Sequence, residues 1–149
     1  MINGKMYLRK AKMEDVDLLF GWVNDKSVRE NSFDGHLISY DEHVSWFKRM
    51  MDDPDQVQYI LMLDDIPVGQ IRLCCDKDIA VISYSIAQSQ RGKGYGSDII
   101  KLVTEKIKED RLDIKKVVGR VKPNNIASVK CFISNGFEES FSQFEYELK

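Results

Sequence analysis

The stretch SQRGKGYGS, residues 89–97, places three glycines at every second position with two basic side chains among them. An apolar run, residues 79–86, precedes it, and a run with helical spacing, residues 94–109, follows it. A helix amino terminus leaves about four backbone N–H groups unpaired and carries roughly half a positive charge. Glycine lets a ligand approach the backbone because it has no Cβ. The pattern therefore predicts a phosphate cradle between a strand and a helix.

The glycine spacing excludes two familiar nucleotide loops. A nucleoside-triphosphate loop needs Gly-x-x-x-x-Gly-Lys-Ser/Thr, and this stretch has no Gly-Lys-Ser/Thr in that place. A dinucleotide loop needs Gly-x-Gly-x-x-Gly inside a β-α-β unit. Here the glycines recur at every second residue, and the segments before them are typical of an antiparallel meander. The cradle belongs to a different class of fold.

Working outward from this loop, hydrophobic periodicity predicts six strands and four helices. Ser39 and Glu42 have the spacing of a capping box that opens the second helix, and Asn135-Gly136 ends the last one. A polar segment, residues 29–33, has no predicted element. The order indicates a mixed, mostly antiparallel α/β sheet with helices on both faces. The predicted strands are 6–9, 57–63, 66–75, 79–86, 117–121 and 141–148, and the helices are 14–23, 40–51, 94–109 and 126–134.

Bulk composition predicts one domain spanning residues 1–149. The chain is 43% hydrophobic and 31% charged, and at this length roughly two-thirds of the unfolded surface can be buried. A net charge of −2 gives no bulk electrostatic reason to bind nucleic acid or an anionic membrane. We find no signal peptide and no apolar run near the ~20 residues of a membrane span. Three cysteines, interpreted as buried small hydrophobes and not as a metal site, suggest a reducing, cytoplasmic location.

Two motifs in order resemble a known family. Residues 91–96, Arg-Gly-Lys-Gly-Tyr-Gly, resemble the acetyl-CoA loop of the GNAT superfamily of N-acetyltransferases. Downstream, VKPNNIASVKCFISNGF, residues 121–137, is similar to that family's segment of strand, proline, asparagine and helix ending in Gly-Phe. Asn125, Ser128 and Gly136-Phe137 occupy the matching positions. The resemblance runs from about residue 5 to the end of the chain.

The resemblance implies acetyl-CoA as cofactor and assigns residues to it. Backbone N–H groups of the loop would hold the pyrophosphate, and the end of the preceding strand would pair with pantetheine like an added strand. That strand is splayed from residues 117–121 in the family, and the N–H of Ile86 would polarise the acetyl carbonyl. Asn125 would contact pantetheine, and Ser128 would either lie at the cofactor or serve helix packing. The implied cofactor residues are Tyr84, Ser85, Ile86, Ala87, Arg91, Gly92, Lys93, Gly94, Tyr95, Gly96, Ser97, Asn125 and Ser128.

The catalytic acid and base stay open. Many relatives place a tyrosine where this chain has Phe132, so the acid is Tyr84, Tyr95 or no residue at all. His43 is a candidate proton carrier in the acceptor cleft, with exposure to solvent as the alternative. An amine with a pKa of ~10.4 would cost roughly 4–5 kcal/mol to deprotonate at pH 7, but one near ~8 costs about 1.4 kcal/mol. We therefore expect direct attack by a weakly basic amine, driven by proximity.

Residues 1–55 are expected to form the acceptor side. The stretches LLFGWVNDKSVRENSF, residues 18–33, and SYDEHVSWF, residues 39–47, resemble acetyltransferases of bacterial surface-sugar pathways. Those enzymes modify the 4-amino group of a nucleotide-linked deoxysugar, as in pseudaminic acid synthesis. The candidate substrate-binding residues are Trp22, Asn24, Arg29, His43 and Trp46. The alternative for Trp22 is a place in the hydrophobic core. The alternative for Asn24 and Arg29 is a solvated position at a helix end. The rival functions are acetylation of a protein amino terminus, acetylation of a polyamine, and a catalytically inactive CoA-binding sensor. Monomer and homodimer both stay open.

Overall fold

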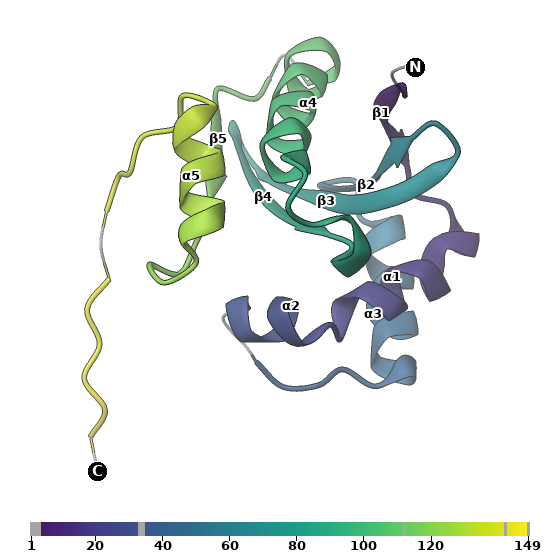
Figure 1. Ribbon diagram of the computed structural model, residues 1–149, viewed down its shortest axis with the longest axis horizontal. Coiled ribbons are helices and arrows are strands. Elements are labelled where there is room, and N and C mark those ends of the chain that lie inside the picture. The colour runs from purple at the N-terminus through teal and green to yellow at the C-terminus, as the bar shows by residue number, and fades with distance from the viewer. Residues whose placement is uncertain (1–3, 33–34, 112, 142, 149) are drawn as a thin grey trace.

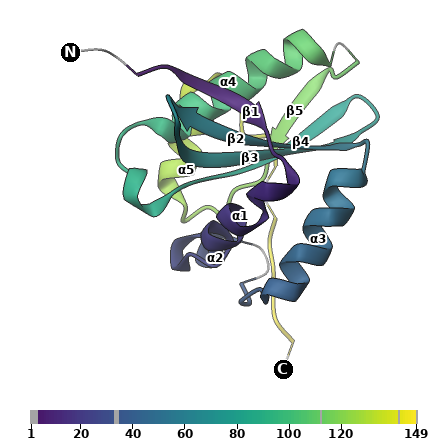
Figure 2. The same ribbon diagram turned by 90° about the vertical axis from the view of Figure 1, so that its right-hand side faces the viewer.

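A computed structural model describes residues 4–32, 35–111, 113–141 and 143–148. Its centre is a five-stranded sheet in the order β1-β2-β3-β4-β5, antiparallel except for the parallel pair β4 and β5. Helices α4 and α5 cover one face of the sheet, and α1, α2 and α3 lie on the other (Figure 1, Figure 2). The strands are β1 (Met6–Lys10), β2 (Gln56–Leu63), β3 (Ile66–Asp76), β4 (Ile79–Ile86) and β5 (Lys116–Gly119), and the helices are α1 (Val16–Val23), α2 (Lys26–Asn31), α3 (Tyr40–Asp52), α4 (Tyr95–Asp110) and α5 (Ile126–Ser134), with 3-10 turns η1 (Met13–Asp15) and η2 (Gln88–Gln90).

Tight turns hold the meander in register. Leu63 faces Ile66 and Asp76 faces Ile79, so two residues close each hairpin. The first residue of each loop has a positive φ, 53° at Asp64 and 57° at Lys77. Two-residue hairpins of this kind need left-handed backbone, which suits an aspartate. The antiparallel meander predicted from the sequence is confirmed, and so is the mixed sheet.

The sheet separates two apolar cores. On one face, the predicted stripe of α4 is buried against the sheet, and Ile99, Ile100 and Val103 are fully buried. On the other face, Phe47 and Met50 of α3 pack into a smaller cluster with β2 and α1. Ser39 caps α3 by accepting a hydrogen bond from the N–H of Glu42, as the capping box predicts. The smaller core leaves part of its sheet face open, and that part becomes the floor of a cleft.

One helix was not expected from the sequence. The polar segment predicted to lack an element contains the second half of α2, which begins after Asp25. The Asp25 carboxylate accepts hydrogen bonds from the N–H groups of Ser27 and Val28 and so caps this helix. The helix has six residues and none is buried, so it lacks the apolar periodicity that reveals a helix in a sequence.

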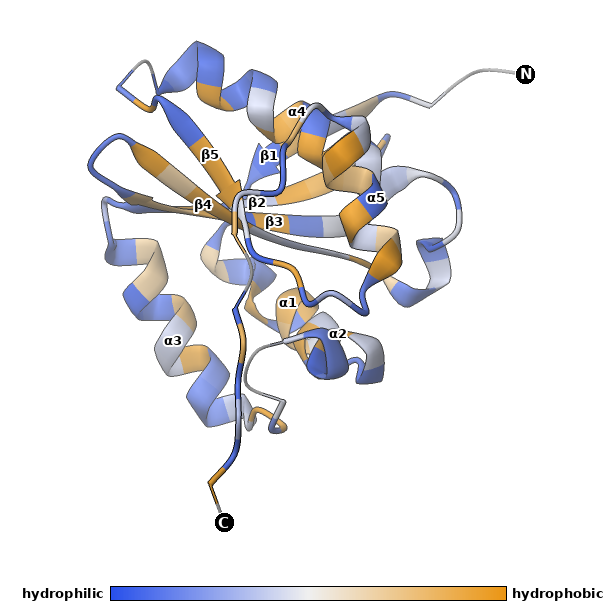
Figure 3. Cartoon of the chain, turned by 90° about the vertical axis from the view of Figure 1, so that its left-hand side faces the viewer, coloured by the Kyte–Doolittle hydropathy of each residue, from blue (hydrophilic) through white to orange (hydrophobic). Residues whose placement is uncertain are grey.

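The predicted closing strand is wrong. Residues 141 and 143–148 have no strand pairing, and the chain runs away from the sheet after α5 (Figure 1). Apolar and polar residues alternate along this tail (Figure 3), yet the side chains of Phe144, Tyr146 and Leu148 are 94%, 88% and 90% exposed. Alternation reports a preference for extended backbone, but a strand also needs a neighbouring strand to pair with. No described strand pairs with this segment.

Candidate functional site

The parallel pair β4–β5 opens before β4 ends. Its register runs from Ile79 opposite Lys116 to Ile82 opposite Gly119, whereas β4 stays paired with β3 as far as Ile86. The N–H of Ala87 donates to the Val68 carbonyl at 2.9 Å, which fixes the alternation along this edge. The backbone groups of Ser85 and Ala87 therefore point to β3, and those of Tyr84 and Ile86 point into the gap. A ligand in the gap can pair with Tyr84 and Ile86 only.

The glycine loop lies at the end of this gap and presents free backbone donors. Helix α4 begins at Tyr95, and its first helical hydrogen bond runs from the N–H of Asp98 to the Gly94 carbonyl. Within the described chain, the six N–H groups of residues 92–97 have no backbone or side-chain acceptor. Gly92 and Gly94 have φ of 78° and 84°, and a Cβ on either would enter open space beside these donors. The loop thus fits a pyrophosphate, as the sequence predicts.

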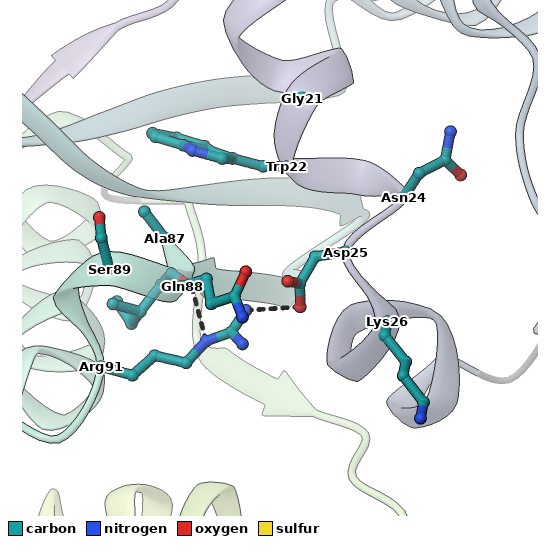
Figure 4. Close-up of a pocket in the computed structure, with 10 residues that line it drawn as sticks. Gly21, Trp22, Asn24, Asp25, Lys26, Ala87, Gln88, Ser89 and Arg91 are labelled. Carbon is teal, nitrogen blue, oxygen red and sulfur yellow. Dashed lines mark hydrogen bonds and ion pairs between the residues drawn. The ribbon is translucent and has the colours of Figure 1, made fainter.

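The side chain of Arg91 is turned away from these donors. Its Nε donates to the Ile86 carbonyl at 3.0 Å, and its Nη2 donates to the Asp25 carboxylate at 2.8 Å (Figure 4). Burial alone would raise the pKa of Asp25, but the hydrogen bond from Arg91 brings it below its ordinary value. Because Asp25 also caps α2, this ion pair ties the loop to the acceptor-side helices.

A cleft of about 1330 Å³ runs from the helices α1–α3, across the sheet face, to the gap and α5. A second cavity of about 560 Å³ adjoins it (Figure 4). The cleft brings together most predicted site residues: Trp22, Arg29, His43, Trp46, Tyr84, Ser85, Ile86, Arg91, Gly92, Gly94, Tyr95, Gly96, Asn125 and Ser128. Asn24 and Ala87 line only the smaller cavity. Lys93 and Ser97 line neither, because Lys93 is turned to Gln90 and the Ser97 hydroxyl to Ser134 on α5.

Tyr84 meets α5 at the mouth of the gap. Its hydroxyl lies 2.9 Å from the Ser128 hydroxyl, and burial raises its pKa to about 12. Asn125 caps α5 by accepting from the N–H of Ser128. The ring of Phe132 packs against Tyr84 with centroids 6.0 Å apart. A Cβ on Gly119 would stand 2.2 Å from Phe132 Cζ, so the tip of this ring points at β5 and has no room for a tyrosine hydroxyl.

Two predicted substrate-binding residues, Asn24 and Arg29, make hydrogen bonds to neighbouring backbone. The Asn24 amide bridges the backbone of Ile38, donating to its carbonyl at 2.6 Å and accepting from its N–H at 2.8 Å. The Arg29 guanidinium donates to the Val23 carbonyl, the His36 carbonyl and the Ser32 hydroxyl. These two side chains therefore hold the backbone of His36 and Ile38 in place, and their binding of a substrate stays a prediction.

His43 lies inside the helix layer. It is 2% exposed, its Nε2 is 2.9 Å from the Val16 carbonyl, and its ring lies among Phe20, Trp46 and Phe47. Burial lowers its pKa, although Val16 and Asp17 act in the opposite sense. This position excludes the alternative that the side chain faces solvent, whereas the predicted role as a proton carrier stays a prediction. The site suits a neutral imidazole that joins α3 to α1.

A polar patch on the cleft floor was not predicted from the sequence. Gln58 donates to Gln70 at 2.8 Å, and Gln70 donates to the Ser85 hydroxyl at 3.0 Å. Arg72 lies beside them, opposite Gln58 on β2 and Ser83 on β4. The signal is present in the sequence, since these polar residues alternate with buried apolar ones along three strands.

The cleft is positively charged, in contrast to the chain as a whole. Its lining holds five arginines (Arg29, Arg49, Arg72, Arg91 and Arg120) and two carboxylates (Asp41 and Glu42). The whole chain has a formal net charge of −2. Basic residues are thus gathered in the cleft, although the net charge of the whole chain is negative.

Further expectations concern metals, membranes and cysteines. In the described ranges, no three His, Cys, Asp or Glu side chains are grouped as a metal site would need. No helix in that part of the chain is long and apolar enough to cross a membrane. The cysteines are not all buried as predicted: Cys75 is buried, Cys131 is half-buried, and Cys74 is exposed on the same sheet face as Arg72.

Similar proteins of known structure share this fold. The chain superposes on a domain from Methanocaldococcus jannaschii with a TM-score of 0.83, 26% identity, and coverage of 95% of this chain and 94% of that one. It superposes on aminoglycoside acetyltransferase AAC(6')-Ib in complex with coenzyme A with a TM-score of 0.79, 20% identity, and coverage of 91% and 86%. For spermidine N-acetyltransferase from Vibrio cholerae, bound to CoA and spermine, the TM-score is 0.81, identity 18%, and coverage 91% and 82%.

Sequence comparison agrees with the structural comparison. An uncharacterized protein of Methanocaldococcus jannaschii is 26% identical over 145 residues, which cover 93% of this chain and 29% of that protein. The chain therefore spans less than a third of the curated relative it matches. A family model, the acetyltransferase (GNAT) domain, matches residues 5–138. The chain belongs to the GNAT acetyltransferase family.

Proposed function

We propose that this acetyltransferase moves the acetyl group of acetyl-CoA to the amine of a small molecule by direct attack within a ternary complex. The observation that carries the proposal is the gap between β4 and β5, which opens at the six free N–H groups of the glycine loop. The acceptor we propose is the amino group of a nucleotide-linked deoxysugar. The donor supplies a thioester, and the chain supplies two binding faces and a polar floor between them.

The donor side uses backbone groups. The N–H groups of residues 92–97 hold the pyrophosphate, assisted by the dipole of α4. The backbones of Tyr84 and Ile86 pair with the pantetheine amides in the gap. The Ile86 N–H then faces the acetyl carbonyl and stabilises the negative charge that develops on its oxygen. Arg91 supports this strand end through the Ile86 carbonyl.

Tyr84 acts on the sulfur as a hydrogen-bond donor. With a pKa of about 12, its phenol stays protonated at neutral pH. Full proton transfer to a thiolate of pKa ~8.5 would be uphill by about 5 kcal/mol. A hydrogen bond to a charged group, in contrast, contributes about 1.5–3 kcal/mol. The proton that the sulfur finally takes therefore comes from water or from the attacking amine.

The acceptor amine loses its proton to water. The buried His43, with its lowered pKa and its bond to Val16, serves to position α3. Two carboxylates line the cleft, Asp41 and Glu42, and both belong to the exposed first turn of α3. The rate thus depends on a weakly basic amine and on its alignment with the thioester.

The positive cleft favours an anionic acceptor over a polycation. Spermine, which is bound by the Vibrio cholerae relative, carries several positive charges at neutral pH. Five arginines against two carboxylates would repel such a molecule from this cleft. A sugar joined to a diphosphate has the complementary charge and a single reactive amine.

The experiment measures thiol release from acetyl-CoA with a panel of amines. Nucleotide-linked 4-amino-deoxysugars should give the highest kcat/KM, ahead of free amino sugars, peptide amino termini and spermine. Turnover highest with peptides or with spermine would overturn the proposed acceptor. Saturable CoA binding with no turnover on any amine would overturn the proposed transfer and favour a CoA-binding sensor.

A further inference from the structure

The cleft floor contains a feature that the acetyl transfer itself does not use. Register places Arg72 on the central strand β3 between Gln58 and Ser83, and Gln70 and Ser85 form the adjacent row. The opposite side of the same strand is wholly apolar, with Ile71 and Leu73 fully buried under α4. Antiparallel sheets commonly pack one face against the core and keep the other polar. Here the polar row lines the cleft, where a ligand can contact it.

The Arg72 guanidinium is held in place but has no opposite charge. Its Nη1 donates to the Gln56 side chain at 2.9 Å, and its Cζ lies 5.3 Å from the centroid of the Trp46 ring. Among the described residues, no carboxylate lies within ion-pair distance of Arg72, whereas Arg9 and Arg91 each have one. A guanidinium has five N–H donors, so most of its donors are available to a ligand.

The surroundings of this arginine add to its suitability for an anion. Burial lowers the pKa of Arg72 relative to a solvated arginine, which shows the cost of placing an uncompensated cation here. An arginine stacked on an aromatic ring presents its planar edge, which matches the two oxygens of a phosphate or carboxylate. Arg49 follows Trp46 by one helical turn on α3 and lines the same cleft.

We propose that Arg72, stacked on Trp46, is a specificity-determining subsite that binds an anionic group of the acceptor. The shared chemistry is a bidentate oxyanion, which a phosphate or a carboxylate can supply. The proposal rests on the proposed acetyl transfer, because it places the anion on the molecule that brings the amine. It also accounts for the Gln56 contact, which orients the guanidinium across the floor of the cleft.

The first test is direct binding. Saturate the protein with CoA to occupy the loop, and use the Trp22→Phe variant so that Trp46 is the one tryptophan left of two. Titration with inorganic phosphate and with acetate should quench its fluorescence saturably, and the tighter anion identifies the source. Arg72→Gln should weaken that binding at least tenfold, and Arg72→Lys less. Arg111→Gln, outside the cleft, serves as the matched control and should bind like the parent.

The second test is kinetic. Glucosamine 6-phosphate is compared with glucosamine, and glycine with glycinamide, so that each pair differs by one anionic group. Arg72→Gln should raise KM for the anionic member at least tenfold and leave KM for its uncharged partner and for acetyl-CoA within twofold. Thermal unfolding of each variant confirms that it is folded.

The outcomes separate this proposal from the proposed function. Equal anion binding in the parent and in Arg72→Gln, or no saturable binding, would overturn the subsite. Acetyl transfer without preference for the anionic amines would do the same and leave the transfer intact. Anion binding that depends on Arg72, with no acetyl transfer to any amine, would support the subsite and refute the transfer.

Discussion

At the scale of single residues, the proposed role of Tyr84 can be tested separately from Phe132. The Phe132 ring is directed at Gly119, where a hydroxyl would not fit, and the Tyr84 hydroxyl on β4 lies beside Ser128 of α5. We propose that Tyr84 donates a hydrogen bond to the sulfur and does not act as an acid, because burial raises its pKa to about 12.

Tyr84→Phe should therefore lower kcat about 10- to 100-fold, the loss of one hydrogen bond to a developing charge. KM for acetyl-CoA should stay within twofold, because the backbone of residue 84 still pairs with the donor. Tyr95→Phe is the comparison, and it should retain the parent kcat. Steady-state thiol release measures both. An unchanged kcat in Tyr84→Phe would show that the hydroxyl takes no part.

His43 predicts a pH dependence of folding. Its folded-state pKa is lowered by burial, so the unfolded chain binds the proton more tightly. The stability it contributes is present above the unfolded value of about 6.5 and is lost as the pH falls toward the folded value. Urea unfolding should show a free energy that declines from pH 7.5 to 5.5. His43→Gln should flatten this slope, and an unchanged slope would contradict the prediction.

At the scale of elements, the loop before α4 has a left-handed backbone, which only glycine adopts easily. Gly94 and Gly136 have nearly the same φ, 84° and 85°, and a Cβ on either meets open space. They differ in place, since Gly94 precedes α4 at the free N–H groups and Gly136 follows α5.

Alanine at either position should cost about 1–2 kcal/mol of folding stability, because both are left-handed. CoA affinity, measured by calorimetry, should fall more than tenfold in Gly94→Ala, whose methyl group stands where the phosphate binds. Gly136→Ala should bind CoA as the parent does. Equal affinity in the two variants would refute the cradle.

The contact between β5 and α5 predicts a second element-scale effect. Gly119 lets Phe132 lie directly on the strand, and a Cβ there would overlap the ring at 2.2 Å. Gly119→Ala should destabilise the fold by about 1–3 kcal/mol through overpacking, measured by urea unfolding. The double variant Gly119→Ala with Phe132→Leu should lose less free energy of unfolding than the sum of the losses in the two single variants. If the losses of free energy of unfolding are additive, the Phe132 ring moves aside without hindrance and the predicted contact is refuted.

At the scale of the whole molecule, the structure differs from the sequence prediction in the tail, where the described residues of the predicted closing strand do not pair with the sheet. Residues 143–148 contribute no pairing to the sheet, whereas Phe137 packs on Phe132 with ring centroids 5.0 Å apart. Ending the chain after Ser140 should shift the thermal midpoint by less than about 2 °C. Ending it after Asn135 also removes Phe137 and should lower the midpoint by several degrees. A large shift in the first truncation would restore the predicted closing strand.

The ion pair between Arg91 and Asp25 joins the donor loop to the acceptor helices at this same scale. Its two residues lie 66 positions apart in the sequence. The sequence shows one as a cation in a loop and the other as a carboxylate at a helix end, and it does not show that they meet. Through Arg91 this contact connects the loop, the end of β4 and α2 (Figure 4).

The sequence by itself determined the antiparallel meander, the main helices and the glycine loop. Each is a local consequence of periodicity, capping and φ preference, and these act within a few residues. Only the tertiary structure decided which polar side chains still face a ligand. Asn24, Arg29 and His43 are all polar residues. In the folded chain their side chains form hydrogen bonds with the backbones of Ile38, Val23 and Val16, respectively. Arg72 keeps most of its donors because strand pairing sets it on the cleft floor, where no carboxylate of the described residues lies within ion-pair distance. Long-range pairing assigns such partners, and no short stretch of sequence contains that information.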